Sequence, residues 1–385
     1  MMKNKVFMML AAMSMAMMAS CIDDEPAGKE CDIESAWVED DFAGHFMDVT
    51  DMRKENISST ETEITFTVRS LISLPQIPVK FKITPGATIE PASGSLQDFS
   101  TPVIYTVTSE DGQWQRKYVV QFKEPELPVF SLGFENVEVR DYFNNNTYHY
   151  FFEYDAGGMR RDVWDSGNLG ALMLMKDAKP EDLPTYSTPD GRTGKALCLN
   201  TQSTGEFGVS FGKPIAAGNL FWGKFVTEKV IFEPLKSTQF GVVFDKEPVR
   251  VIGYYKYKPG PVFTNKDNKE VPGRTDEAGI YAAFYRNKDA NGNPYFLYGD
   301  DVETDEKLKA NPQVYKIARV ASLPPTDTWK PFEMFFEGKD ADDQLVVQQG
   351  FNLALVFSSS KGGAQFEGAV GSTLYVDDVV ISCEK

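Results

Sequence analysis

Residues 374–382, with the sequence LYVDDVVIS, have the composition of a β-strand, because β-branched and aromatic residues dominate them. Similar segments recur upstream, at residues 220–225, 240–244, 280–285, 295–298 and 351–357. Only residues 305–310 suggest a helix, and that helix is short. Residues 128–385 are therefore predicted to form a large β-sandwich with long loops.

A smaller set of strands precedes this region, at residues 31–124. Along residues 64–68 and 79–83 apolar side chains alternate with threonine or lysine, so each strand has one buried and one wet face. Residues 103–107 and 118–122 flank the turn sequence EDGQ, which predicts a β-hairpin. The pattern indicates a small immunoglobulin-like β-sandwich.

The chain of 385 residues is long enough for two hydrophobic cores. The sequence KEPELP at residues 123–128 separates the two regions. Its two prolines and two acids oppose both a helix and a central strand, so this segment is the predicted linker.

The N-terminus has the features of an export signal. Lys3 and Lys5 precede an apolar run at residues 6–18, which is too short to span a bilayer. The Ala-Ser-Cys sequence that follows resembles a lipobox, in which Cys21 becomes the acylated first residue. Residues 1–20 are then a lipoprotein signal peptide and residues 21–30 an acidic tether. A plain signal peptide with a chance cysteine is the alternative.

The tether begins with three acids at residues 23–25. They resemble a surface-export signal of some Gram-negative lipoproteins, which implies an outer-membrane anchor with the protein facing the cell exterior. The whole chain has 56 acidic and 39 basic residues, a formal charge of -17. This charge repels phosphate backbones and anionic lipids. We therefore expect no nucleic-acid partner, membrane contact through the lipid anchor only, and a neutral or weakly charged ligand.

Three cysteines remain after Cys21, namely Cys31, Cys198 and Cys383. An odd number in an oxidising compartment allows at most one pair to close. A bridge between Cys198 and Cys383 and two isolated buried thiols are both compatible with the sequence.

Four segments resemble the putative carbohydrate metabolism domain family. They are residues 164–168 (WDSGN), 218–223 (GNLFWG), 253–258 (GYYKYK) and 358–378, the last being the most specific. The resemblance implies a surface lipoprotein with an immunoglobulin-like first domain and a β-jelly-roll second domain. It also implies a role in glycan use, because the jelly roll is similar to carbohydrate-binding modules and to some glycoside hydrolases. It supplies no catalytic residues.

Several strings match enzyme motifs in letters only. Residues 208–212 (GVSFG) match a nucleophile elbow, but they lie in an apparent strand without the strand-turn-helix context. Residues 358–361 (SSSK) match S-x-x-K, but the companion motifs are missing. The only histidines, His45 and His149, fall in different regions. The sequence therefore predicts neither a zinc site nor a Ser-His triad.

A glycoside hydrolase needs two carboxylates at a set separation. Five acids fall close together early in the second domain: Glu135, Glu153, Asp155, Asp162 and Asp165. A solvated acidic stretch is the alternative interpretation, so enzymatic activity stays open.

Aromatic side chains are the better indication of a binding site, because sugar rings stack on them. Tyr255 and Tyr257 share one face of a predicted strand, and Tyr254, Lys256 and Lys258 share the other. The tyrosine pair is a candidate stacking platform, although one of the two faces could equally be core.

Trp164 stands beside Asp165 and Asn168 among glycines, which indicates a loop that combines a ring with hydrogen-bonding groups. These three residues are a second candidate site. Trp222 lies in an apolar run and is expected in the core, whereas Trp329 could be in either place.

Asp377 and Asp378 are consecutive in an otherwise apolar strand, so period two sends one carboxylate to each face. One of them should be half-buried, which is costly without a partner. Jelly-roll modules that resemble this one often hold a structural calcium where the last strand meets the start of the domain. Asp377 and Glu135 are therefore the predicted metal ligands, with backbone-capped acids as the alternative.

These features together predict a surface-anchored lipoprotein that binds a glycan for polysaccharide capture or utilisation. A glycoside hydrolase on the same scaffold and a structural or adhesin-like surface protein are the alternatives.

Overall fold

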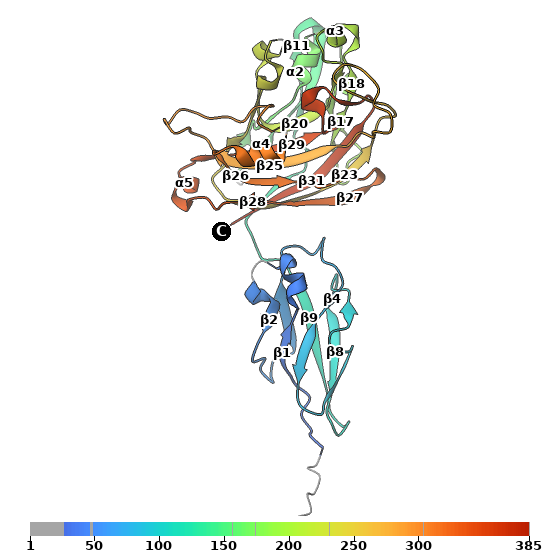
Figure 1. The fold of residues 1–385 in the computed structure, drawn as a ribbon, viewed down its shortest axis with the longest axis vertical. Helices are drawn as coiled ribbons and strands as arrows, with labels where there is room; N and C mark the ends of the chain where they lie inside the picture. The colour runs from blue at the N-terminus through green and yellow to red at the C-terminus, as the bar shows by residue number, and fades with distance from the viewer. Residues whose placement is uncertain are drawn as a thin grey trace, which may run out of the picture. The chain divides into compact units, whose positions relative to one another are not determined.

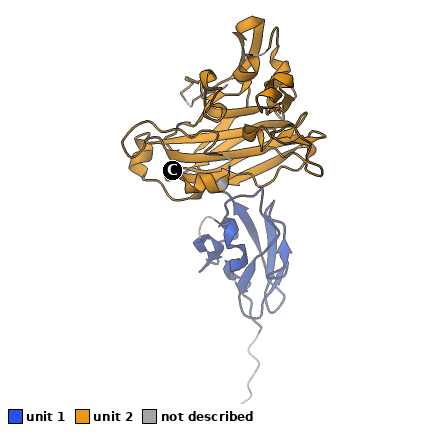
Figure 2. Ribbon diagram, turned by 45° about the horizontal axis from the view of Figure 1, so that its top comes forward, with its two compact units in different colours: residues 1–126 blue, residues 127–385 orange. Residues whose placement is uncertain are grey.

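The computed structural model describes residues 27–46, 49–155, 157–173, 175–230, 232–302 and 304–384. It divides into two compact units, Met1–Glu126 and Leu127–Lys385 (Figure 2). The division falls inside the segment predicted as the linker. The predicted signal peptide and Cys21 lie outside the described residues, as does most of the tether. Within the described part of the chain, no helix is long and apolar enough to cross a membrane.

The first unit is a small immunoglobulin-like β-sandwich. One sheet has the order β2-β1-β5, a second has the order β3-β9-β8-β6, and β4 pairs with β7. The strands are β1 (Ile33–Trp37), β2 (Arg53–Lys54), β3 (Glu63–Thr67), β4 (Ile77–Pro78), β5 (Lys80–Ile83), β6 (Thr88–Glu90), β7 (Leu96–Gln97), β8 (Val103–Thr108) and β9 (Gln115–Lys123), with short 3₁₀ helices η1 (Asp40–His45) and η2 (Val49–Met52).

The core of this unit follows the predicted alternation. Ile64 and Phe66 on β3 are buried while the threonines beside them are partly exposed. The Phe66 ring stacks on Phe122 of β9, with centroids 5.1 Å apart. The hairpin predicted from the EDGQ turn is formed by β8 and β9, which pair in antiparallel register.

The second unit contains two large sheets (Figure 1). Sheet I has the order β16-β17-β31-β23-β27, with β10 also paired to β31. Its strands are β10 (Val129–Leu132), β16 (Thr185–Thr188), β17 (Ala196–Asn200), β23 (Pro248–Lys258), β27 (Thr326–Phe335) and β31 (Thr373–Cys383). Sheet II has the order β15-β20-β29-β25-β26-β28, with β21 on β20 and β22 on β29. Its strands are β15 (Trp164–Asp165), β20 (Asn219–Phe225), β21 (Thr238–Phe240), β22 (Val242–Val243), β25 (Gly279–Arg286), β26 (Val314–Arg319), β28 (Glu337–Gly338) and β29 (Phe351–Ser358).

Smaller elements extend from these sheets. Short strand pairs are β11 (Val137–Tyr142) with β12 (Asn146–Phe151), β13 (Glu153–Tyr154) with β14 (Arg160–Arg161), β18 (Gln202–Ser203) with β19 (Ile215–Ala216), and β24 (Phe263–Thr264) with β30 (Gly368–Ala369). The α-helices are α2 (Asn168–Leu172), α3 (Gly205–Ser210), α4 (Asp305–Ala310) and α5 (Asp343–Val347), and the 3₁₀ helices are η3 (Phe143–Asn145), η4 (Pro180–Asp182), η5 (Thr227–Lys229), η6 (Pro234–Lys236) and η7 (Gly363–Gln365). In Figure 1, α2, α3 and β11 gather at one end of the unit.

The two sheets enclose one hydrophobic core, as in a jelly roll. On β31, Leu374 and Val376 point into this core and are 0% exposed. Phe357 on β29 and Phe284 on β25 enter the same core from sheet II. The all-β prediction, with a small sandwich followed by a large jelly roll, is confirmed.

Local predictions succeeded where the apolar run was long. The four segments at 220–225, 280–285, 351–357 and 374–382 are β20, β25, β29 and β31, and residues 305–310 form α4. The segment 240–244 is split at Gly241, where φ is +105°. A Cβ atom at this position would lie only 2.5 Å from the Tyr285 hydroxyl, so a larger residue would not fit.

Two other local predictions were wrong. Residues 295–298 form no strand, because Leu297 makes only an isolated bridge to Phe240. The apolar side chain of Leu297 packs in a buried hydrophobic cluster instead. Residues 208–212 were expected in a strand, but 208–210 belong to α3 (Gly205–Ser210). Gly205 and Gly212 take left-handed backbone at φ +68° and +67° and bracket this single turn.

Candidate functional site

Trp164 lies in the core and not in a loop, so that interpretation was wrong. The side chain is 1% exposed on β15, and its ring packs 5.8 Å from the ring of Trp222 on β20. Its Nε1 donates a hydrogen bond of 2.8 Å to Glu153. A sugar cannot stack on a ring that is covered on both sides.

The two polar neighbours of Trp164 have structural contacts. Asn168 is 1% exposed, and its amide exchanges hydrogen bonds with the backbone of Thr185. Asp165 accepts backbone N–H bonds from Ser166 and Phe225. Burial raises the pKa of Asp165 to about 6. These groups tie β15 and α2 to neighbouring elements and do not form an open polar loop.

Tyr255 and Tyr257 also lie on the core face, so the tyrosine platform proposed for that face was wrong. They are 5% and 2% exposed, and the Tyr255 hydroxyl donates to the carbonyl of Pro324. The other face of β23, with Tyr254, Lys256 and Lys258, is the outer face of sheet I.

That outer face carries a line of side chains across the strands. The register pairs Tyr186 with Cys198, Cys198 with Tyr375, and Tyr375 with Lys256. Lys256 in turn places its ammonium 4.6 Å from the ring centroid of Trp329 on β27. We call these five residues the aromatic row. Neighbouring strands lie about 4.8 Å apart, so the row spans about 19 Å.

The rings of the aromatic row are partly exposed, whereas the thiol between them is not. Tyr186, Tyr375 and Trp329 are half-buried, and Cys198 is 0% exposed. Burial raises the pKa of Cys198 to about 11 and that of Tyr375 to about 12. Because cysteine is small and uncharged, it leaves the two tyrosine rings free to flank it at the surface.

Polar groups border the aromatic row on one side. Two residues further along the same strands, the register pairs Asn200 with Thr373 and Thr373 with Lys258. The Asn200 amide donates a hydrogen bond of 2.8 Å to the Thr373 hydroxyl. We call these three residues the polar row. It presents an amide, a hydroxyl and an ammonium next to the rings.

The opposite border is built by the loop between β16 and β17. The Arg192 guanidinium lies 3.8 Å from the ring centroid of Tyr254 and pairs with Asp378 at 2.6 Å. Asp377 accepts the backbone N–H groups of Arg192 and Thr193. These contacts hold the loop over the outer face of sheet I.

Asp377 and Glu135, the predicted metal ligands, both contact this same loop. Glu135 accepts the backbone N–H of Lys195 at 2.9 Å, and Asp377 is fully buried under Arg192 and Thr193. Both carboxylates therefore accept hydrogen bonds from peptide N–H groups. This is the arrangement expected if the acids are capped by the backbone and not bound to a metal. The described residues contain no cluster of three or more metal-binding side chains. The calcium stays a prediction.

The remaining acids of the early second domain make internal contacts. Glu153 is half-buried, and burial raises its pKa to about 7. Asp155 accepts the N–H groups of Gly157 and Met159, while Asp162 pairs with Arg160. These acids therefore stabilise the turns and strands around them.

The serine motif at residues 208–212 shows no nucleophile geometry. The Ser210 hydroxyl donates to the carbonyl of Phe207 in the same turn. The Nδ1 atom of His149 accepts the backbone N–H of Ser187. The Ser210 hydroxyl and the His149 ring therefore each bond to backbone groups and not to one another.

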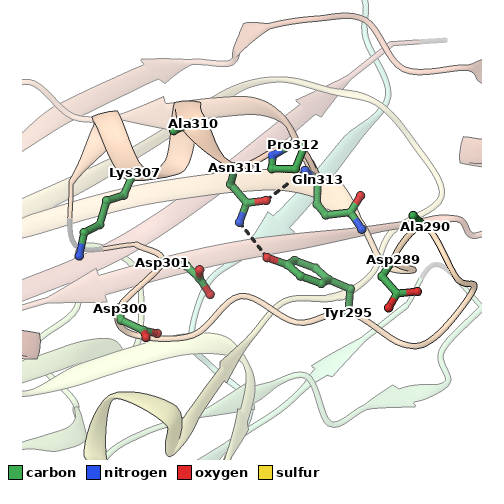
Figure 3. A pocket seen from close by; sticks show the side chains of 10 residues that line it. All are labelled: Asp289, Ala290, Tyr295, Asp300, Asp301, Lys307, Ala310, Asn311, Pro312 and Gln313. Carbon is green, nitrogen blue, oxygen red and sulfur yellow. Dashed lines mark hydrogen bonds between the residues drawn. The ribbon is translucent and has the colours of Figure 1, made fainter.

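A separate pocket of about 650 Å³ lies between the loop that follows β25 and the segment around α4 (Figure 3). Tyr295 projects into it, and its hydroxyl accepts a hydrogen bond of 2.8 Å from Asn311. Asp289 and Asp301 on its wall accept backbone N–H groups of their own loops. The pocket has one ring and no line of rings, so it is a poorer match to a glycan chain than the aromatic row.

The cysteines not assigned to lipid are free and buried: Cys31, Cys198 and Cys383. The prediction of isolated buried thiols is confirmed. Sequence reasoning missed Tyr186 and Tyr375. The signal for Tyr375 was present, because it alternates with the core residues Leu374 and Val376. No strand had been expected around Tyr186.

Comparison with known proteins extends over both units. The sequence matches the family described as "Putative carbohydrate metabolism domain" over residues 133–382 and the one described as "SGBP, N-terminal" over residues 46–122. The chain is similar to a crystal structure described as a putative glycoside hydrolase from Bacteroides thetaiotaomicron, with 35% identity, a TM-score of 0.58, and coverage of 94% of this chain and 99% of that chain. A second such structure, from Bacteroides vulgatus, has 36% identity and a TM-score of 0.60, with coverage of 66% and 98%. No curated protein matches the chain.

Proposed function

Because the chain belongs to the putative carbohydrate metabolism domain family, we propose that the aromatic row on the outer face of sheet I binds a glycan. The observation that carries the proposal is the strand register, which brings Tyr186, Tyr375 and Lys256 into one line. Sugars present flat C–H faces that pack on aromatic rings. A line of partly exposed rings therefore suits a chain of sugar units that runs across the strands.

The polar row supports the same ligand. Sugar hydroxyls need hydrogen-bond partners when they leave water, and Asn200 and Thr373 offer an amide and a hydroxyl beside the rings. Lys258 adds an exposed donor at the end of this row. The combination of rings and hydrogen-bonding groups is the pattern that the sequence led us to seek at Trp164.

The expected affinity is modest. A ring pair contributes about 1 kcal/mol beyond its buried area, and the row offers three rings: Tyr186, Tyr375 and Trp329. The surface is also open, so the bound chain keeps much of its hydration. We expect affinities in the micromolar to millimolar range, which suits a protein that captures a polymer through repeated contacts.

The proposed location is the outer membrane, with the protein lipid-anchored through Cys21 and facing the cell exterior. The N-terminal sequence motivates this part of the proposal. The match of residues 46–122 to the "SGBP, N-terminal" family is consistent with a first unit that acts as a spacer. The whole chain would then capture polysaccharide at the cell surface.

The test uses the soluble protein that begins at residue 22. It should bind members of a broad polysaccharide panel in affinity electrophoresis, and Trp329→Ala should weaken that binding severalfold. The matched control is Trp114→Ala, since Trp114 is 56% exposed in the first unit and should not contribute. Equal effects of both variants, or binding to nothing in the panel, would favour the structural or adhesin-like alternative.

Hydrolysis is the second candidate function. The two similar structures are both described as putative glycoside hydrolases. Glu153 has a pKa of about 7, so a large fraction of this carboxyl is protonated at neutral pH, as a general acid requires. Its contact with the core residue Trp164 argues for a structural role instead. Release of reducing ends from a bound polysaccharide, lost in Glu153→Gln, would establish hydrolysis.

A further inference from the structure

The aromatic row contains a cation that no acidic side chain neutralises. The Lys256 ammonium lies 4.6 Å from the ring centroid of Trp329 and 4.9 Å from that of Tyr375. Among the described residues it makes no hydrogen bond and no ion pair. Its three N–H donors are therefore directed at solvent or at a ligand.

Two arginines at this sheet are paired with acids. Arg192 pairs with Asp378 at 2.6 Å. Arg250, on the same strand as Lys256, pairs with Glu333 at 3.3 Å. Lysines of this sheet without an acidic partner among the described residues, such as Lys258, are exposed. Lys256 differs from both groups because it is half-buried between rings and yet has no carboxylate.

The two rings keep this ammonium in place. Cation–π contacts favour a lysine over an aromatic face by about 0.5–1 kcal/mol at exposed sites. They compensate for part of the hydration that the lysine loses, but they do not use its hydrogen-bond donors. A ligand that stacks on Trp329 or Tyr375 must therefore place its own polar groups beside a positive charge.

We propose that the glycan bound by the aromatic row carries a carboxylate, as a uronic acid does, and that this carboxylate pairs with the Lys256 ammonium. The inference rests on the proposed function of the row and names its ligand more closely. A carboxylate accepts charge-assisted hydrogen bonds from an ammonium, and such bonds are stronger than those from a neutral hydroxyl.

The acid must be an occasional substituent and not a dense row of charges. Asp190 acts electrostatically on Tyr375, and Asp327 is exposed two residues along the chain from Trp329, so a dense polyanion on the row would also meet negative groups near these rings. The net charge of -17 repels a polyanion from the protein as a whole. One acidic sugar among neutral ones satisfies Lys256 without meeting these acids.

The test uses glucuronoxylan and gum arabic, each before and after chemical reduction of its carboxyl groups, which replaces each carboxylate by a neutral hydroxymethyl group. The soluble protein from residue 22 should bind the acidic form of at least one polymer about threefold to tenfold more tightly than the reduced form. High salt should remove this preference, because it screens a partly exposed ion pair. Dextran sulfate serves as the sulfated arm.

Three substitutions locate the effect. Lys256→Met removes the charge but keeps most of the length of the side chain for contact with the rings, and should abolish the preference for the acidic form. Lys256→Arg keeps the charge and should retain it. Lys330→Met removes an exposed lysine of β27 that belongs to neither row and should also retain it. Melting temperatures verify that the variants are folded.

Each outcome separates this inference from the proposed function. Equal binding of acidic and reduced polymers, or an unchanged preference in Lys256→Met, would overturn the inference, while loss of all binding in Trp329→Ala would still support the row as the glycan site. Tighter binding of dextran sulfate than of any uronic-acid polymer would overturn the carboxylate assignment. Failure of both polymers in both forms would overturn the inference and count against the proposed function.

Discussion

Cys198 and Tyr375 are cross-strand neighbours on the outer face of sheet I, and the thiol is fully buried while the ring beside it is partly exposed. Tyr186 flanks the same cysteine from β16. The two tyrosine rings therefore cover this part of the sheet. The reactivity of the Cys198 thiol shows whether the rings are in place.

This relationship predicts the reactivity of the thiol. In the native protein Cys198 should react very slowly with a thiol reagent at pH 8, because it is buried and its pKa is raised to about 11. Tyr375→Ala should open one side of the cover and speed the reaction at least tenfold, measured by mass spectrometry of labelled peptides. Cys383, buried far along β31, is the internal control and should stay unreactive. Fast labelling of Cys198 in the unaltered protein would contradict the proposed cover.

Core and surface tryptophans should respond differently to truncation. Trp164→Ala should destabilise the second unit by about 3–5 kcal/mol, because it leaves a cavity between two sheets and removes the partner of Glu153. Trp329→Ala should change stability by less than about 1 kcal/mol, since that ring is only half-buried. Urea unfolding measures both. Equal losses of stability in the two variants would mean that the aromatic row is part of the packing.

The fold class could be predicted because long strands have a recognisable pattern of apolar residues in the sequence. In β31 the alternation of Leu374, Tyr375 and Val376 already separates a core face from an outer face. The same reasoning on β23 placed Tyr255 and Tyr257 on one face and Tyr254 and Lys256 on the other. It could not show which of these two faces packs against the opposing sheet. Tyrosine and lysine both suit a surface, and only the opposing sheet decides which of the two faces is buried.

Trp164 shows where local reasoning fails. Its neighbours are Asp165, glycine and asparagine, which favour a loop, and yet β15 is a two-residue strand pinned by Trp222 across the sheet. The pairing joins residues 58 positions apart, 164 and 222, so no local pattern carries it. Tyr186 was missed for the same reason, because β16 is short and its partner strand defines it.

Anchoring depends on one residue outside the described part of the chain. Cys21→Ala expressed in a Gram-negative host should take up no labelled fatty acid and should leave the detergent phase on partitioning. The protein should still fold, because both hydrophobic cores lie beyond residue 30. Continued labelling of the variant would remove the lipoprotein proposal.

The proposed structural calcium can be tested through Asp377. If an ion bridges Asp377 and Glu135, adding EDTA to calcium-loaded protein should lower the melting temperature of the second unit by several degrees. An unchanged melting temperature would leave the backbone hydrogen bonds from Arg192 and Thr193 as the partners of this acid. Asp377→Asn should destabilise in either case, by about 1–3 kcal/mol, since it replaces one of the buried acceptors.

The pH dependence of stability should reveal the protonation of Glu153. Burial raises the pKa of this carboxyl from 4.5 to about 7 in the folded protein. Between these two values the folded state binds more protons than the unfolded chain, so raising the pH through this window lowers the free energy of unfolding. The contribution of Glu153 is therefore complete below pH 4.5 and is lost as the pH rises through 7.

Glu153→Gln removes this dependence while keeping an acceptor for the Trp164 Nε1 atom. The variant should match the unaltered protein near pH 4 and exceed its stability at pH 8 by about 1–3 kcal/mol. Glu138→Gln is the control of opposite sign, because hydrogen bonds from Arg160 and Arg140 lower the pKa of Glu138 to about 2, and its contribution is present above pH 4.5. That variant should be less stable than the unaltered protein at pH 8. Parallel stability curves for Glu153→Gln and the unaltered protein between pH 5 and 8 would show that Glu153 is ionised throughout, and would also exclude it as the acid of a hydrolase.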